Sequence, residues 1–136
     1  MKIPKRTKYK KYHRLNKNLY KNASKSLFLT YGFFGLKSVE GGFITERQIE
    51  SVRQTINKKI KNQGKLWIRC FANRPITAKP LEVRMGKGKG SVKRWVCAVY
   101  PGSLLYEING VSKVKATKIF KIASKKLPVK TKLVEF

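Results

Sequence analysis

The sequence predicts an α+β fold in which two helices pack on one side of a mainly antiparallel sheet, with a basic extension at the N-terminus. Two segments, near residues 45–64 and 112–128, carry apolar residues at helical spacing, and about five shorter segments alternate as strands do. Their order is not strictly β–α–β, which favours antiparallel pairing. Because 136 residues suffice for one domain, we expect an extension at 1–26 and a single α+β domain at 27–136.

The first predicted helix starts at Thr45, since Thr45 and Gln48 have the spacing of a capping box. Gly64 lies just beyond its expected end, where glycine is common. The apolar stripe that we expect to be buried is Ile49, Val52, Ile56 and Ile60. Arg47 and Lys58 belong to the opposite face, and we expect them to contact phosphates.

The second predicted helix begins after Ser112 and ends before Pro128, which cannot continue a helix. Its expected buried stripe is Ala116, Ile119, Phe120, Ala123 and Leu127. Strands are expected at 27–37 (or a bent hairpin), 66–71, 81–85, 92–100, 104–109 and 129–134, with turns or loops at 41–42, 74–76 and 79–80. Trp67 and Trp95 lie in alternating strands, and we expect both to pack in the core.

Positive charge dominates the composition. Lys and Arg number 33 against six acidic residues, which gives a formal net charge of +27. Such an excess destabilises a compact chain by self-repulsion unless counter-charge is near, so we expect a permanent nucleic-acid partner. A solvated basic surface and an anionic membrane surface are the alternatives. No apolar run approaches the ~20 residues that span a bilayer, and we expect no membrane partner.

The N-terminal extension alternates basic residues with tyrosines and contains no acidic residue. It is too charged to fold alone and should order on RNA, with its tyrosines stacking on bases or packing on the domain. A disordered solubilising tail is the alternative. The extension supplies the candidate RNA-binding residues Lys5, Arg6, Lys8, Lys10, Lys11, His13 and Arg14. The domain adds Arg47, Lys58, Arg69, Arg74, Lys79, Lys93 and Arg94.

A glycine-rich loop stands between two predicted strands and is the most specific motif of the chain. It consists of Arg84, Met85, Gly86, Lys87, Gly88, Lys89 and Gly90. Its glycines let the backbone approach another molecule closely, and all its charges are positive. It lacks the spacing of a P-loop and of a dinucleotide-binding loop. An ordinary hairpin turn with incidental lysines is the alternative, but two-residue turns are commoner in hairpins.

The residues capable of chemistry do not form a catalytic set. His13 is the single histidine, and Glu46 and Glu50, the two acids sharing a helix face, suit the helix dipole. Cys70 and Cys97 have no CxxC pattern and are expected to be small buried residues in a reducing compartment. We therefore expect no enzymatic activity, cofactor, metal or small-molecule substrate. An RNA-modifying or RNA-cleaving enzyme is the rival hypothesis.

Several blocks resemble the bacterial-type large-subunit ribosomal protein L sixteen family. They are PKRTKYKKYH at 4–13, FGLKSVEGGFITERQIESVRQTI at 34–56, GKLWIRCF at 64–71, RPITAKPLEVRMGKGKG at 74–90 and LLYEINGV at 104–111. The resemblance covers nearly the whole chain in order and spacing, except that residues 15–30 fit poorly.

The resemblance implies a non-catalytic protein with an α+β fold that binds and orders large-subunit rRNA near the peptidyl-transferase centre and the aminoacyl-tRNA site. It also implies that the Arg84–Gly90 loop lies close to bound tRNA and that ribosomal proteins are neighbours. Another basic RNA-binding or RNA-processing protein is the alternative. The abundance of Lys, Asn, Ile and Phe suggests an A+T-rich genome and fits an organelle-encoded protein. The segment FANRPITAKPLEVRMGKGKG and the ending KLVEF resemble mitochondrial members of the family more than plastid ones, so we expect a mitochondrial ribosome, with a plastid or bacterial ribosome as alternatives.

Overall fold

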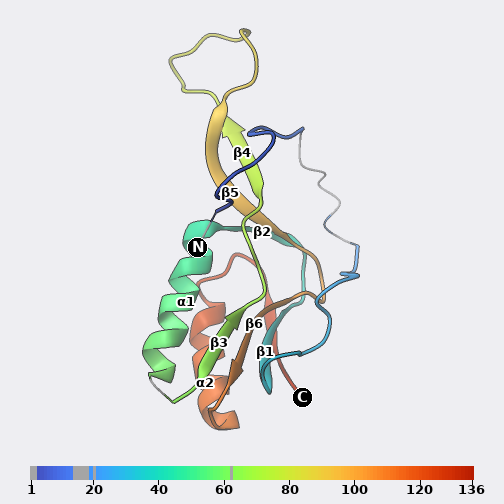
Figure 1. Cartoon of the computed structure of the whole chain (residues 1–136), viewed down its shortest axis with the longest axis vertical. Helices are drawn as coiled ribbons and strands as arrows, with labels where there is room; N and C mark the ends of the chain where they lie inside the picture. The colour runs from blue at the N-terminus through green and yellow to red at the C-terminus, as the bar shows by residue number, and fades with distance from the viewer. Residues whose placement is uncertain (1–2, 14–18, 20, 62) are drawn as a thin grey trace.

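The computed structural model describes residues 3–13, 19, 21–61 and 63–136. Within these residues it contains two helices and seven strands (Figure 1). In chain order they are β1 (Phe34–Ser38), β2 (Gly42–Thr45), α1 (Glu46–Ile60), β3 (Lys65–Ile68), β4 (Arg74–Ala78), β5 (Ser91–Val99), β6 (Leu104–Asn109), α2 (Lys113–Ser124) and β7 (Thr131–Glu135). The predicted α+β fold is confirmed.

The strands form two antiparallel sheets where we had expected one. The larger has the order β3-β6-β1-β7 and the smaller the order β2-β5-β4. Both helices lie on one side of the larger sheet (Figure 1). Tyr106 and Ile108 of β6 are fully buried and belong to the same hydrophobic core as the apolar residues of both helices. From the smaller sheet, β4 and β5 extend away from the helices as a long hairpin, while Ile44 of β2 and Val99 of β5 remain in the core (Figure 1).

Helix α1 begins and packs as its sequence predicts. Thr45 Oγ1 accepts a hydrogen bond from Gln48 N (3.3 Å), and Gln48 Oε1 accepts one from Thr45 N (2.9 Å), so the capping box is complete. All four residues of the predicted apolar stripe are buried. The helix ends at Ile60, and Lys61 follows with a positive φ of 54°.

The prediction of the second helix is confirmed as α2, although its N-terminus is capped less well than that of α1. Ser112 occupies the N-cap position, but its side chain makes no capping hydrogen bond. Four residues of its predicted stripe are buried, namely Ala116, Ile119, Phe120 and Ala123. The helix ends at Ser124, so Leu127 lies beyond it and is half-buried against the core.

The prediction of a strand at 81–85 is wrong. These residues lie in the connection between β4 and β5, where Leu81 and Met85 are almost fully exposed. The strand lies earlier, at β4, where prolines had predicted a loop. Within the described chain, β4 pairs with β5 alone, and an edge strand tolerates the missing N–H of Pro75.

Two further boundaries differ from the prediction. Gly42, expected in a turn, begins β2, and residues 27–33, expected in a strand, precede β1 as an irregular segment. The thiol positions agree with the prediction of small buried residues. Cys70 is buried and Cys97 half-buried, both are free, and burial raises the pKa of Cys70 to about 12.

Candidate nucleic-acid interface

The β4–β5 hairpin carries the glycine-rich loop away from the rest of the domain. The connection, residues 79–90, lies at the far end of the molecule from the two helices (Figure 1). Gly86 and Gly88 have positive φ values of 99° and 80°, and a Cβ on either would meet nothing within 4 Å. Lys87 between them also has a positive φ, of 51°. The loop backbone is therefore open to contact on its outer side, as a close-approaching loop requires.

The base of the loop is closed by tighter packing. A Cβ on Gly90 would lie 2.5 Å from the backbone oxygen of Ala78, so only glycine fits there. Lys79 Nζ donates a hydrogen bond to the Gly86 carbonyl, which ties the two sides of the loop together. The side chains of Arg84 and Lys87 are exposed and make no hydrogen bond or ion pair within the described residues. These two cations are available to an external anion.

The N-terminal extension meets this loop. Lys11 Nζ donates a hydrogen bond to the Lys89 carbonyl (2.7 Å), and Lys89 Nζ donates one to the Tyr12 carbonyl. We call this reciprocal pair the lysine clasp. It gathers two basic segments, 77 or 78 residues apart in the sequence, at one end of the molecule.

Most of the basic residues predicted in the extension are exposed. Residues 3–13 form neither helix nor strand, and the exposed candidates are Lys5, Arg6, Lys8, Lys10, Lys11 and His13. Arg14 lies outside the described residues. Further along, Ala23 N donates a hydrogen bond to the Pro101 carbonyl (2.9 Å), and Leu19 is buried. Of the described residues in this part of the extension, Leu19 and Ala23 are thus packed against the domain.

The remaining basic candidates lie on the hairpin and on α1. Lys79, Lys93 and Arg94 are exposed on the hairpin, and Arg74 is half-buried at the start of β4. Arg47 and Lys58 are exposed on α1. Eleven residues of helix separate these two side chains by about 16 Å on nearly the same face.

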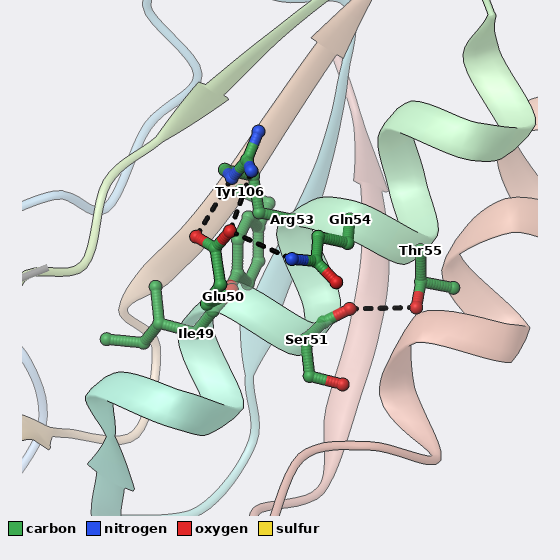
Figure 2. A network of polar contacts seen from close by, with 7 residues as sticks. All are labelled: Ile49, Glu50, Ser51, Arg53, Gln54, Thr55 and Tyr106. Carbon is green, nitrogen blue, oxygen red and sulfur yellow. Dashed lines mark hydrogen bonds and ion pairs between the residues drawn. The ribbon is translucent and has the colours of Figure 1, made fainter. Parts of the chain in front are cut away.

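Helix α1 neutralises its own acidic residue at its second turn. Glu50 accepts hydrogen bonds from Arg53 at 2.7 and 3.0 Å and from Gln54 at 3.1 Å (Figure 2). The hydrogen bonds and charge of Glu50 raise the pKa of Arg53. Beside this network, the Tyr106 hydroxyl donates to the Ile49 carbonyl at 3.2 Å (Figure 2). Glu50 is therefore a helix-stabilising residue in this structure.

Arg69 has an internal partner that the sequence did not reveal. Its guanidinium forms an ion pair with Glu107, whose side chain is completely buried in the central strand β6. Glu107 Oε2 also accepts hydrogen bonds from the backbone N–H groups of Thr30 (3.1 Å), Tyr31 (2.7 Å) and Gly32 (3.0 Å). A charged residue inside an otherwise apolar strand was the available signal for such a cluster.

The surroundings of Glu107 favour its charged form. Burial alone would raise the pKa of this carboxyl group, but the three N–H donors and the Arg69 guanidinium stabilise the carboxylate, and its pKa lies below the ordinary value. The cluster holds residues 30–32 against the sheet. Arg69 thus supports the fold, whether or not it also contacts RNA.

The described residues contain no group of three or more His, Cys, Asp or Glu side chains placed to hold a metal ion. Neither of the two described helices is long and apolar enough to cross a membrane.

The chain is similar to ribosomal proteins along almost its full length. Residues 4–134 match the family "Ribosomal protein L16p/L10e". A large ribosomal subunit protein uL16 of Buchnera aphidicola subsp. Cinara cedri is 52% identical over 128 residues, which are 94% of this chain and 92% of the relative. A uL16 protein of Buchnera aphidicola subsp. Acyrthosiphon pisum is 50% identical over 131 residues, 96% of this chain and 94% of the relative. The predicted family is confirmed: this chain belongs to the ribosomal protein L16p/L10e family.

Proposed function

We propose that this chain is a structural constituent of the large ribosomal subunit, where it binds and orders rRNA. The observation that supports this most directly is the lysine clasp, which brings the basic extension and the glycine-rich loop to one end of a protein of net charge +27. The family consists of ribosomal proteins rather than enzymes, so the prediction of a non-enzymatic chain is confirmed.

The binding mechanism is charge neutralisation combined with fit to RNA shape. Exposed lysines and arginines displace counterions from phosphates, which lets the rRNA helices approach one another. We assign the exposed cations of the extension and of the hairpin to this role, and Arg47 and Lys58 serve a second RNA segment along α1. Ribosomal proteins are the expected neighbours.

The glycine-rich loop has the more specialised role in this proposal. Arg84 and Lys87 reach toward the peptidyl-transferase centre and lie close to the aminoacyl-tRNA. Their exposure and lack of internal partners support this role, as do the open glycines on either side of Lys87. Arg84 can bind a phosphate or a guanine edge with two hydrogen bonds, while Lys87 acts as a point charge.

The proposal also concerns the compartment whose ribosome contains this chain. The excess of lysine over arginine and the many asparagines and isoleucines support an organelle-encoded origin, and the resemblance of residues 71–90 and of the ending KLVEF to mitochondrial members of the family supports a mitochondrial ribosome. A plastid or bacterial ribosome is the alternative, and the two relatives described above are bacterial proteins.

Sedimentation of the native chain tests the function. We expect it to co-sediment with the large ribosomal subunit, and a chain that sediments free of ribosomes would refute the proposal. The free chain should also bind its rRNA fragment with an affinity that drops about 10³-fold or more between 50 and 200 mM salt, if six or more phosphates are contacted. An affinity independent of salt would contradict the neutralisation mechanism.

A pair of double variants tests the loop. Arg84→Ala with Lys87→Ala removes two loop cations and should leave the thermal midpoint unchanged while slowing tRNA-dependent steps of translation. Lys121→Ala with Lys125→Ala removes the same charge from exposed positions of α2 and the residue after it. The loop role is refuted if both double variants translate at the same rate, or if the loop variant unfolds.

A further inference from the structure

The face of the four-stranded sheet opposite the helices carries three exposed aromatic residues and the half-buried Trp67, which the charge-based function does not use. We infer that this surface, which we call the aromatic platform and which consists of Tyr31, Phe33, Trp67 and Phe136, binds an unpaired RNA base by stacking. The inference rests on the proposed function, because it requires RNA beside the chain. It adds a recognition mode that differs from phosphate neutralisation.

Strand register places these residues on one face. Trp67 pairs with Glu107, Glu107 with Gly35, and Gly35 with Val134, so the four positions form a row across the sheet. Side chains alternate along a strand, so Phe33 and Phe136, each two residues from this row, point to the same side. The neighbours of Glu107 in β6, Tyr106 and Ile108, point into the core that the helices share.

The platform is held in place before any ligand arrives. Tyr31 follows Thr30 and precedes Gly32, and all three backbone N–H groups donate to the buried carboxylate of Glu107. A Cβ on Gly32 would lie 2.6 Å from the Ile108 carbonyl oxygen, so the segment lies directly on the strand. Because its backbone is already ordered, Tyr31 loses little conformational entropy on binding.

The rings are ordered and yet exposed. Tyr31 stacks on Trp67 with a centroid distance of 6.0 Å and an interplanar angle of 16°, and Phe33 meets Phe136 edge-on at 6.4 Å. Tyr31, Phe33 and Phe136 are nonetheless 54%, 58% and 90% exposed. A surface hollow is lined by these three rings together with Leu29, Thr30, Gly32 and Asn109. It offers ring surfaces and a few polar groups, which is what base recognition needs.

The charge around the platform favours a nucleic acid over an apolar segment of a neighbouring protein. The Arg69 guanidinium carbon lies 5.2 Å from the centre of the Tyr31 ring, and Lys65 lines an adjoining hollow with Trp67 and Asn109. Of the nearby carboxylates, Glu107 is paired with Arg69, and Glu135 is paired with Lys113 at 2.7 Å. Aromatic rings beside the guanidinium of Arg69 and the exposed Lys65 suit a stacked base and its phosphate.

Photocrosslinking of purified large subunits tests the inference in the assembled particle. After irradiation at 254 nm and digestion with trypsin, we expect a nucleotide adduct on the peptide 26–37 or the peptide 133–136. A crosslink from these peptides to another protein would assign the platform to a protein neighbour and overturn the inference. Particles that contain the chain but give no adduct on either peptide would also overturn it. Absence of the chain from the particles would instead refute the proposed function.

Matched variants in the free full-length chain give a second readout. Phe33→Ala with Phe136→Ala should weaken binding of a single-stranded rA10 oligonucleotide by about 5- to 100-fold, the effect of losing one stacked base. Phe28→Ala is the control, since Phe28 is 80% exposed but does not line the hollow. Binding of a ten-base-pair RNA duplex should not change in either variant. Equal loss of rA10 affinity in the control and in the double variant would refute the stacking role.

Discussion

The buried Glu107 carboxylate provides the sharpest test of how the domain is held together. Glu107→Gln keeps the size of the side chain and one acceptor oxygen, but removes the charge that faces Arg69. In the unsubstituted chain the carboxylate accepts hydrogen bonds from three backbone N–H groups and forms an ion pair with one guanidinium. Counting each as a charge-assisted hydrogen bond of about 1.5–3 kcal/mol would give roughly 6–12 kcal/mol. That sum is too large, because the oxygen of the glutamine side chain still accepts hydrogen bonds from these N–H groups.

The ion pair with Arg69 gives a better value for the loss in the free energy of unfolding. Removing one partner of a buried ion pair costs about 3–5 kcal/mol. The glutamine retains an acceptor for the N–H groups, so we expect a loss of about 3 kcal/mol in the free energy of unfolding. With a urea m-value of about 2 kcal/mol/M, the midpoint of unfolding should fall by about 1.5 M.

The assay is urea unfolding of the full chain, followed by tryptophan fluorescence at neutral pH and moderate salt. Glu135→Gln is the matched control, because it makes the same chemical change in the exposed Lys113–Glu135 ion pair. Exposed pairs contribute about 0–1 kcal/mol, so this control should shift the midpoint by less than 0.5 M, an upper limit that follows from about 1 kcal/mol and the same m-value. Equal midpoints for the two variants at unchanged m-values would refute the assignment of Glu107 as an anchor.

Three further predictions concern pH, capping and the loop base. Because the pKa of Glu107 is lowered in the folded state, its contribution to folding stability is complete above the ordinary glutamate pKa of about 4.3 and is lost as pH falls through the folded-state value. The free energy of unfolding should therefore fall less steeply with acid in Glu107→Gln than in the unsubstituted chain. Parallel pH curves for the two proteins would contradict this. Thr45→Ala should cost about 1 kcal/mol in urea unfolding and Ser112→Ala less, since only Thr45 makes a capping hydrogen bond; equal losses would disprove the difference. Gly90→Ala should broaden the amide NMR signals of the hairpin, because its Cβ would lie 2.5 Å from the Ala78 oxygen; an unchanged spectrum would show that the loop base is not constrained.

The parts of the fold that depend on local patterns were predictable from the sequence. The capping box and apolar stripe of α1 are encoded in residues three or four apart, and the structure has both as expected. The position of β4 was not predictable, because proline excludes a residue from the middle of a sheet but not from its edge. Which strand lies at the edge is set by tertiary pairing.

The candidate site likewise contains motifs that the sequence shows and contacts that only the structure shows. The motif Arg84–Gly90 and the basic extension are visible in the sequence, and their roles stay predictions here. Their contact through Lys11 and Lys89 joins distant segments, and no local pattern encodes it. The anchoring of Tyr31 by Glu107 is hidden for the same reason, since it links positions 76 residues apart.

Strand β5 places the glycine-rich loop far from the rest of the domain, so a small rotation of the domain displaces the loop considerably. Its nine residues extend about 30 Å, from the pairing with β2 beside α1 to the open end of the hairpin. If the domain rotates by about 5° about the β2 end of this strand, the tip of the hairpin moves by about 2.6 Å over that length. A shift of this size changes which hydrogen bonds Arg84 can form. Substitutions far from the tip, at surfaces where the domain contacts its partners, would then alter the contacts of the loop without changing the loop itself.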